Sequence, residues 1–396
     1  MNRILKDIVY LSEDLKHRES ATQQEAQAAD YIETRIQPFV DVVQKSTFNV
    51  VKNAKLLMSA YYGEFIFICA LAFWWPAIAL YYGAIVFFAY MAEHMGFPVF
   101  SRLFAGAQST NITGIKKDRR AQKLLIFTAY MDTSHNFIAK WFRHTFVHIF
   151  KGIIPAFMIL VLAVLFVDVY GDYADGMDTI SLWIKIVTLV FFVFIALITS
   201  AASLAGKRSP GANNNASGVA AILEIAERLH KDPIPNTTVL YFFSGDHFGT
   251  MADMRKLSQE INSLKKNTCI INLEGVGAGD LHYTEAEGIL FRVPCSNRLV
   301  KAASEISEKF KVRKARVHRF MTNAYLPLLR GIPGISLVGL DKNHFPRNYG
   351  TPDDIPLHLD AGTVSQAVNF AETLGRKVTS MKEEGGESLS IGSSPE

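Results

Sequence analysis

The sequence predicts an α/β fold built on a mostly parallel sheet, with transmembrane helix hairpins inserted into its loops. Four short apolar runs alternate with helical stretches, which is typical of a sheet covered on both faces by helices. Two other windows are apolar over lengths that suit a bilayer. The 396 residues are 49% hydrophobic and 20% charged, which excludes a disordered or collagen-like chain.

The strand and helix signals alternate along the polar part of the chain. The expected buried strands are Lys123–Tyr130, Thr237–Ser244, Thr268–Leu273 and, more weakly, Gly334–Leu340. The expected helices are an amphipathic N-terminal segment, Glu19–Val40, Ala216–His230, Thr250–Lys265, Asn297–Phe310 and Ala361–Met381. In such sheets the ligand site lies at the carboxyl ends of the strands, so the residues that follow each run are the candidates for function.

The second apolar window predicts a membrane hairpin. Its two arms, Ile153–Tyr170 and Leu182–Ala205, are each long enough to cross a hydrocarbon layer of about 30 Å. Their link is acidic and contains no basic residue.

The first apolar window, Phe65–Met91, allows two interpretations. One is a single kinked span, and the other is a hairpin of Leu56–Trp74 and Ala77–Phe97 that turns at Trp74-Trp75-Pro76. The hairpin places Glu64 inside the first arm.

Membrane orientation follows from the charges beside these windows. Basic residues flank the predicted membrane ends at Lys52, Lys55, Arg102, Lys140, Arg143, Lys151, Lys207 and Arg208. The positive-inside tendency therefore predicts a multi-pass integral membrane protein whose α/β domain faces the cytoplasm. If the sheet elements before and after each window form one body, each window must cross an even number of times. This parity favours four spans.

These considerations define the domains. An α/β domain is expected from residues 1–55, 98–150 and 206–381, with inserted hairpins at 56–97 and 151–205 and a disordered tail at 382–396.

The composition and motifs argue against several classes of protein. There is no run of basic residues interleaved with aromatics, so no nucleic-acid partner is expected. The three cysteines form no C-x-x-C pair, which argues against a disulfide framework or a cysteine zinc site. The N-terminus has no signal-peptide pattern.

Ordered motifs in the polar part resemble the zinc-dependent aminopeptidases of peptidase family M28, whose clan also holds glutaminyl cyclases and the transferrin-receptor ectodomain. They are SPGANNNASGVAAILEIAERL from Ser209, YFFSGDHFG from Tyr241, INLEGVG from Ile271, GIPGISLVG from Gly331 and NYGTPDD from Asn348. The resemblance implies a zinc-exopeptidase-like fold, a mixed sheet between helices.

The resemblance also implies a site of two zinc ions at the strand ends, but most of its ligands are replaced here. The metal-ligand positions fall on Tyr130, Asn214, His247, Glu274 and Gly350, the second-shell carboxylate on Asp132, and the general base on Asp246. In the family, the position of Asn214 holds an aspartate that bridges both metals, and the positions of Tyr130 and Gly350 hold histidines.

These replacements remove charge and donor atoms that a metal pair needs. An amide is a neutral ligand, a phenol loses its proton only near pH 10, and glycine has no side chain. A catalytic zinc site needs three protein ligands and an open position. We therefore expect no metal cofactor, and zinc only if the site is rearranged around Asp246, His247, Glu274 and His135.

Each candidate also has a structural interpretation. Asp132 can cap a loop, Asn215 can cap a helix, and Asp246 and His247 can point in different directions because they are sequence neighbours. His344 and His358 lie near the region of the late ligand without aligning with it, which is typical of surface histidines.

The functional prediction is a membrane-embedded, peptidase-like protein without di-zinc aminopeptidase activity. Its partners would be the bilayer and a peptide, a lipid-linked amine or another membrane protein. The alternative is an active membrane-associated metallopeptidase, amide-bond hydrolase or acyltransferase that uses Asp246, His247 and Glu274.

Overall fold

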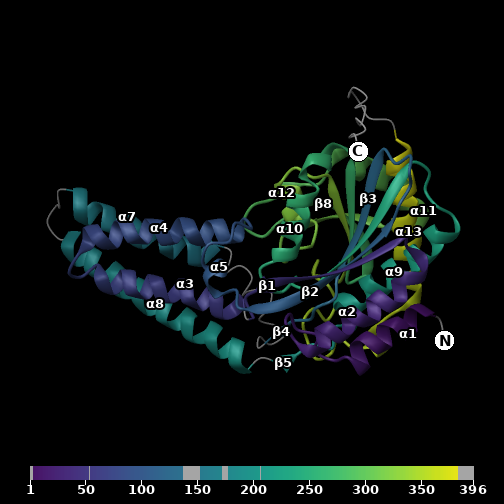
Figure 1. The fold of residues 1–396 in the computed structure, drawn as a ribbon. Coiled ribbons are helices and arrows are strands. Elements are labelled where there is room, and N and C mark those ends of the chain that lie inside the picture. The colour runs from purple at the N-terminus through teal and green to yellow at the C-terminus, as the bar shows by residue number, and fades with distance from the viewer. Residues whose placement is uncertain (1–2, 53, 137–151, 172–176, 206, 382–396) are drawn as a thin grey trace, which may run out of the picture.

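A nine-stranded mixed sheet forms the centre of the larger part of the molecule. The computed structural model describes residues 3–52, 54–136, 152–171, 177–205 and 207–381 (Figure 1). The strand order is β1-β2-β6-β3-β7-β11-β8-β10, with β9 paired to β8. The strands are β1 Val42–Val50, β2 Ala107–Lys116, β3 Lys123–Tyr130, β6 Thr237–Ser244, β7 Thr268–Glu274, β8 Asp280–Glu287, β9 Val293–Pro294, β10 Arg313–Val317 and β11 Gly334–Leu340.

The four strands predicted from apolar runs are the centre of this sheet. β6, β3, β7 and β11 are neighbours and all parallel. β2 is antiparallel to β6, β1 to β2, and β8 to β11, so the outer strands make the sheet mixed. The predicted mixed α/β fold is confirmed.

Helices cover both faces of the sheet, as the two-residue period of β3 requires. Leu125 and Phe127 belong to the core under one set of helices, whereas Ile126 belongs to the core under the other. The first set is α1 Arg3–Val9, α2 Gln23–Ile36, α9 Ser217–Lys231, α11 Asn297–Phe310 and α13 Ala361–Ser380. The second is α10 Ala252–Glu260 and α12 Tyr325–Leu329. The helix predicted at Thr250–Lys265 is shorter than expected and continues as a 3₁₀ segment, Asn262–Asn267.

The two apolar windows form four long helices that project from this α/β body as a bundle (Figure 1). The helices are α3 Ala54–Leu71, α4 Pro76–His94, α7 Ile154–Tyr170 and α8 Met177–Ala205. They share one apolar core, in which residues such as Phe65, Val161 and Phe192 are fully buried. The first window is thus a helical hairpin that turns before Pro76, as one of the two interpretations predicted.

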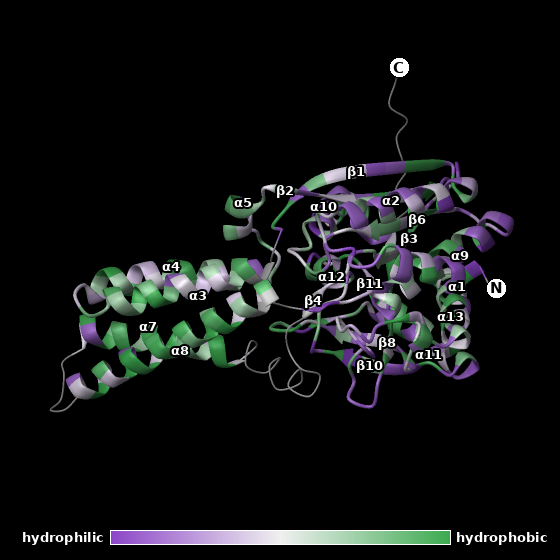
Figure 2. Cartoon of the chain, turned by 90° about the horizontal axis from the view of Figure 1, so that it is seen from below, coloured by the Kyte–Doolittle hydropathy of each residue, from purple (hydrophilic) through white to green (hydrophobic). Residues whose placement is uncertain are grey.

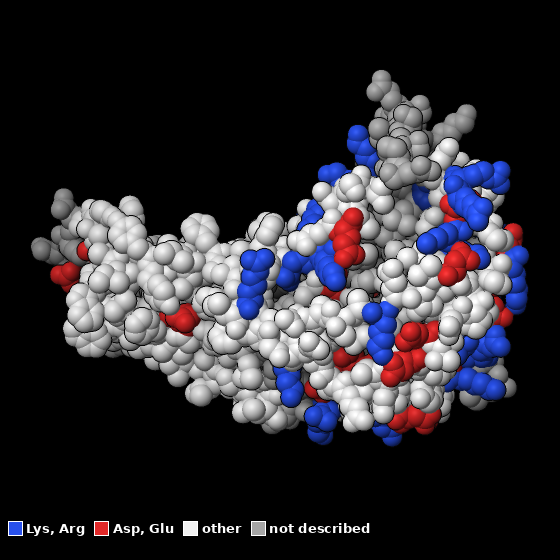
Figure 3. Space-filling view, in the orientation of Figure 1, with Lys and Arg blue, Asp and Glu red and all other residues white. Residues whose placement is uncertain are grey.

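The outer surface of the bundle is apolar as well (Figure 2). Phe88 is 70% exposed and Leu197 is 65% exposed, and Trp74 and Trp75 are exposed at the far end. Figure 3 shows that this surface carries few charges, whereas lysine and arginine are frequent on the α/β body. By length and composition, Pro76–His94 and Asp178–Ala201 could each cross a membrane, while the apolar helices Leu56–Leu71 and Ile154–Tyr170 are shorter.

Polar side chains within the bundle are paired. Asp168 of α7 forms an ion pair with Lys185 of α8 and accepts a hydrogen bond from Ser181 (2.7 Å). Glu64 accepts a hydrogen bond from the Tyr82 hydroxyl (2.5 Å). The charges that interrupt the apolar windows therefore have partners inside the bundle.

Glu93 joins the bundle to a short helix at its base, α5 Phe100–Phe104. Its Oε2 accepts hydrogen bonds from the backbone N–H groups of Val99 (3.0 Å) and Phe100 (3.1 Å) and from the Tyr61 hydroxyl (3.0 Å). A carboxylate at a helix N-terminus stabilises unpaired N–H groups. Glu93 thus caps α5 where the bundle meets the body.

Candidate functional site at the strand ends

Two aromatic rings fill the centre of the candidate site. Tyr130 at the end of β3 is fully buried and stacks on the His247 ring, with centroids 3.9 Å apart and planes 7° apart. The Phe248 ring stands edge-on to Tyr130 at 5.3 Å and continues to Tyr349 at 5.5 Å. The predicted positions Tyr130 and His247 are thus brought together, but as packed rings rather than as a pair of open ligands.

The ring nitrogens of His247 face polar partners on two sides. Nδ1 donates to Oδ1 of Asn323 (2.8 Å), whose amide nitrogen in turn lies 3.4 Å from the Thr128 hydroxyl. Nε2 lies 3.8 Å from Oε1 of Glu274. Burial lowers the pKa of His247 to about 4, so the ring is neutral at physiological pH with its proton on Nδ1.

Glu274, at the end of β7, is fully buried with few donors around it. The Tyr130 hydroxyl donates to Oε1 at 3.5 Å, and the Asn272 amide donates to Oε2 at 3.5 Å, both long hydrogen bonds. Burial is the largest cause that raises the pKa of Glu274 well above its usual range, and the nearby Glu287 raises it further. Burial therefore favours the neutral, protonated form of this carboxyl over its anion.

Asn214, at the position of the bridging ligand, lies in the buried turn before α9. Its backbone N–H donates to Asp354 (3.0 Å) and its amide nitrogen to the carbonyl of Arg347 (3.3 Å), while Oδ1 has no hydrogen-bond partner among the described residues. The next residue, Asn215, accepts from Gly218 N–H (3.2 Å) in the first turn of α9, which matches the expected helix cap.

Asp132 holds the loop that follows β6. Its two carboxylate oxygens accept from the backbone N–H groups of His247 (3.2 Å) and Phe248 (3.0 Å). Burial is the main cause that raises the pKa of Asp132 well above its usual range. This arrangement matches the loop-capping interpretation of Asp132.

Asp246, at the position of the general base, accepts hydrogen bonds from the residues at the start of α10. Oδ2 accepts from the N–H and hydroxyl of Thr250 (3.1 Å each) and from Ala252 N–H (3.3 Å), and Oδ1 accepts from the Ser20 hydroxyl (3.2 Å). Burial, followed by the neighbouring Asp253, raises the pKa of Asp246 to about 7. Three of these four hydrogen bonds come from the loop and the start of α10, which is the role of a structural cap, and the fourth comes from Ser20 of the N-terminal segment.

The remaining candidates do not join this cluster. Gly350 has φ of 64° and is buried, so a histidine at this position would also need a left-handed backbone. His344 and His358 are exposed, as predicted for surface histidines. His135 lies in the two-residue strand β4 (His135–Asn136), which pairs with β5 (Lys207–Arg208).

Two residues outside the predicted site positions also matter for the site. Arg18 is fully buried and donates to the carbonyls of Met131 (2.9 Å), Pro210 (3.0 Å) and Gly211 (3.2 Å), so it ties β3 to the glycine-containing turn before α9. Asn323 orients His247. No sequence signal pointed to Arg18, because it acts through contacts between distant segments.

Comparisons with known proteins identify relatives with this fold. Residues 198–374 match the model of Peptidase family M28. The chain has the fold of peptidase family M28. A zinc aminopeptidase from Bacillus subtilis superposes with a TM-score of 0.55 at 14% identity, covering 94% of this chain and 93% of that one. A glutaminyl cyclase from Bacteroides thetaiotaomicron gives 0.52 at 13% identity, covering 96% and 98%.

One curated relative matches part of the chain. It is the alkaline phosphatase isozyme conversion protein of Escherichia coli, 27% identical over 178 residues. The match covers 44% of this chain and 45% of that relative, so it spans less than half of either protein.

The residues present do not suit the two zinc ions that the M28 fold implies. The Tyr130 hydroxyl is a hydrogen-bond donor to Glu274, and its ring covers one face of the His247 imidazole. Within the described ranges, no group of three or more His, Cys, Asp or Glu side chains is arranged to hold a metal ion. The unpaired Oδ1 of Asn214 is a neutral acceptor and does not replace a bridging anion.

Proposed function

We propose that this chain is a membrane-embedded protein with the M28 fold that lacks di-zinc aminopeptidase activity. We infer that it acts instead by binding a peptide, a lipid-linked amine or a membrane protein partner. The observation that carries the proposal is the buried stack of Tyr130 on His247 at the predicted metal positions.

The physical reason is a deficit of both charge and space. A metal pair would need anionic ligands, but Asn214 has no charge, and burial raises the pKa of Glu274 well above its usual range, which disfavours its anionic form. Deprotonating Tyr130 is opposed as well, because burial raises the pKa of its phenol far above the usual value.

Membrane embedding is supported by the bundle. The four helices bury a shared apolar core and still expose many apolar side chains on their outer surface. A soluble protein rarely exposes so large an apolar area. Of the two longest apolar segments, only 33% of Pro76–His94 and 22% of Asp178–Ala201 are buried, unlike the core helix of a soluble protein. We infer that all four helices span the bilayer, with the α/β body in the cytoplasm.

Metal analysis tests the loss of zinc chemistry. The full chain is purified in detergent after growth in zinc-supplemented medium, and its metal content is measured by mass spectrometry beside hydrolysis of leucine p-nitroanilide. We expect no zinc that depends on His247 and no hydrolysis above background. The matched control is His247→Ala, which identifies zinc bound elsewhere. Two zinc ions per chain that disappear in His247→Ala would refute the proposal.

Cysteine labelling tests the topology. The three native cysteines are buried, so single cysteines can be introduced against a low background. We place one at Thr179, exposed at the far end of the bundle, and one at Ser304, exposed on the body. A membrane-impermeant maleimide added to intact cells should label only Thr179→Cys, and lysis should expose Ser304→Cys. Labelling of Ser304→Cys in intact cells would contradict a cytoplasmic body.

One observation favours the alternative of a working hydrolase or acyltransferase. The pKa of Asp246 is raised to about 7, a value suited to general acid–base catalysis at neutral pH. If the protein is such an enzyme, Asp246→Asn and His247→Ala should each abolish hydrolysis or acyl transfer of a membrane-associated amide. Loss of such an activity in both variants, with unchanged folding, would replace the binding proposal.

A further inference from the structure

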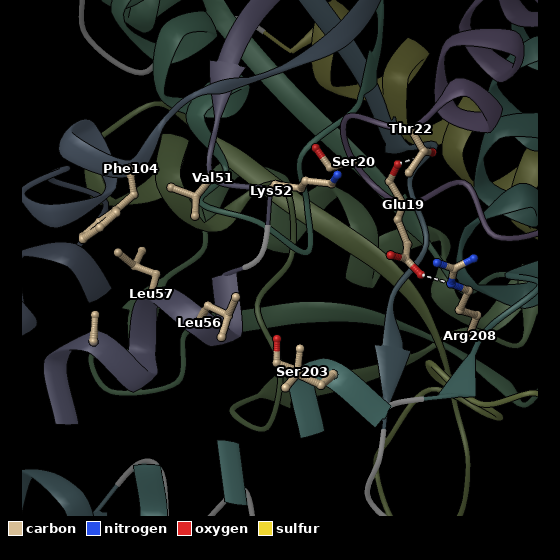
Figure 4. A pocket seen from close by; sticks show the side chains of 12 residues that line it. Glu19, Ser20, Thr22, Val51, Lys52, Leu56, Leu57, Phe104, Ser203 and Arg208 are labelled. Carbon is tan, nitrogen blue, oxygen red and sulfur yellow. Dashed lines mark hydrogen bonds and ion pairs between the residues drawn. The ribbon is translucent and has the colours of Figure 1, made fainter. Parts of the chain in front are cut away.

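A cavity lies at the seam between the helix bundle and the α/β body. It has a volume of about 600 Å³, within the range of small-molecule sites. Figure 4 shows its two walls. The residues that line it are Glu19, Ser20, Thr22, Val51, Lys52, Leu56, Leu57, Ala60, Phe104, Ser203, Leu204 and Arg208.

The wall on the bundle side is apolar and opens to the outer surface. It comes from the first turns of α3, the last turn of α8 and the end of α5. Leu204 is 81% exposed, Phe104 54% and Leu56 45%. These side chains continue the apolar outer surface of the bundle, so an acyl chain lying along the helices could enter the cavity from the side.

The wall on the body side is polar and has a net positive charge. Lys52 lies two residues before α3, and Arg208 lies in β5, three residues after the end of α8, so both cations lie near the ends of the helices where the bundle meets the body. Arg208 pairs with Glu19 (3.1 Å), whereas Lys52 forms no ion pair with any described residue. In Figure 4 the Lys52 side chain points across the cavity toward Ser20.

We propose that this seam cavity binds an anionic glycerophospholipid from the leaflet facing the α/β body, with its phosphate beside Lys52 and Arg208 and one acyl chain against Leu56 and Leu204. The two cations outnumber the single carboxylate, which favours a headgroup of net negative charge over a zwitterionic one. The Ser20 hydroxyl can donate to a phosphate oxygen, whereas the Thr22 hydroxyl already donates to the carbonyl of Glu19 (2.6 Å). The inference rests on the proposed membrane embedding.

The cavity also adjoins the candidate site through one residue. Ser20 lines the cavity, and its hydroxyl donates to Asp246 at 3.2 Å. A lipid phosphate that recruits this hydroxyl would remove one of the four hydrogen bonds to Asp246. The bound lipid is thereby placed next to the strand-end cluster, not at a remote surface.

The test measures lipid retention by the full chain. The protein is reconstituted into vesicles of equal parts phosphatidylglycerol and phosphatidylcholine, extracted in mild detergent, and analysed by native mass spectrometry. We expect retained phosphatidylglycerol in excess over phosphatidylcholine. Lys52→Ala should reduce this excess about fivefold, as expected for one cation near an anionic lipid. Lys256→Ala, at an exposed cation on the body, is the matched control and should change nothing.

A second variant separates the cavity from general surface charge. Ala60→Phe fills the cavity and leaves both cations in place, and it should also reduce phosphatidylglycerol retention. If Lys52→Ala acts but Ala60→Phe does not, the effect is surface charge and the proposal is wrong. If Ala60→Phe acts but Lys52→Ala does not, the cavity takes an uncharged amphiphile and the anionic proposal is wrong. Displacement by millimolar glycerol phosphate would show a headgroup site without a lipid and would also overturn it.

These results are distinguishable from a failure of the proposed function. A chain that does not insert into vesicles contradicts membrane embedding itself. A chain that inserts, yet retains phosphatidylglycerol and phosphatidylcholine equally, contradicts only the lipid site. Equal thermal unfolding of wild-type, Lys52→Ala and Ala60→Phe proteins establishes that the variants are folded.

Discussion

Truncating Tyr130 tests whether packing has replaced metal binding at the strand ends. The Tyr130 ring is fully buried, stacked on His247 and in edge contact with Phe248. Removing a buried aromatic side chain costs about 3–5 kcal/mol, of which the ring pairing contributes about 0.5–1.5 kcal/mol. Tyr130→Phe removes only the hydroxyl, whose hydrogen bond to Glu274 is 3.5 Å long, and should cost about 1 kcal/mol or less.

The assay is thermal unfolding of the detergent-purified chain at one fixed heating rate, because unfolding of such proteins is commonly irreversible. A loss of 1 kcal/mol shifts the unfolding temperature of a domain this large by about 2 °C. We therefore expect Tyr130→Ala to unfold about 6–10 °C below the wild type, and Tyr130→Phe within about 2 °C of it.

Three results would contradict this reasoning. If Tyr130→Phe is as destabilising as Tyr130→Ala, the hydroxyl rather than the ring holds the site together, as it would if it were a ligand. If Tyr130→Ala unfolds at the wild-type temperature, the ring does not fill a packed core. Bound zinc in the wild type but not in Tyr130→Phe would identify the phenol as a ligand.

Three further predictions follow from buried charges. The pKa values of Asp246 and Glu25 are raised to about 7, mainly by burial, so the stability that their neutral forms provide is complete below about pH 4 and is lost as pH rises through 7. The unfolding temperature should thus be higher at pH 5.5 than at pH 8, and Asp246→Asn should reduce this difference. An unchanged difference in the variant would contradict a contribution of Asp246 to the pH dependence. Glu93→Ala should lower the free energy of unfolding by about 1–2 kcal/mol because it uncaps α5, and Glu93→Gln should lower it by a smaller amount. Equal losses of stability in the two variants would show that the cap needs the charge. Lys185→Met alone should cost about 3–5 kcal/mol by leaving Asp168 buried without its partner, whereas adding Asp168→Leu should restore most of this stability in the same unfolding assay.

The central strands of the sheet were predictable because a strand that is buried on both faces consists mostly of apolar residues. β3, β6 and β11 have the predicted limits, since strands covered on both faces must be apolar throughout. The outer strands were missed for the converse reason. β1 and β10 are rich in polar and charged residues and partly exposed, so nothing in their composition separates them from loops.

The positions of the site could be anticipated, but not their present roles. Motif order located Tyr130, His247 and Glu274, which do lie together. Whether Asp246 faces this cluster or the start of α10 depends on one side-chain direction, which no pattern encodes. The part played by Arg18 was equally hidden, because a single arginine in a polar N-terminal segment is ordinarily exposed.

The charges that persist at the strand ends follow a physical rule. Without metal ions, a buried carboxylate is tolerated where backbone N–H groups solvate it, and Asp132 and Asp246 each accept two or more such bonds. Among the described residues, Glu274 has only two long side-chain donors, so burial favours its neutral form. A ligand that brings a positive charge near Glu274, such as a primary amine, would meet a carboxyl that accepts no hydrogen bond from a backbone N–H group of the described residues.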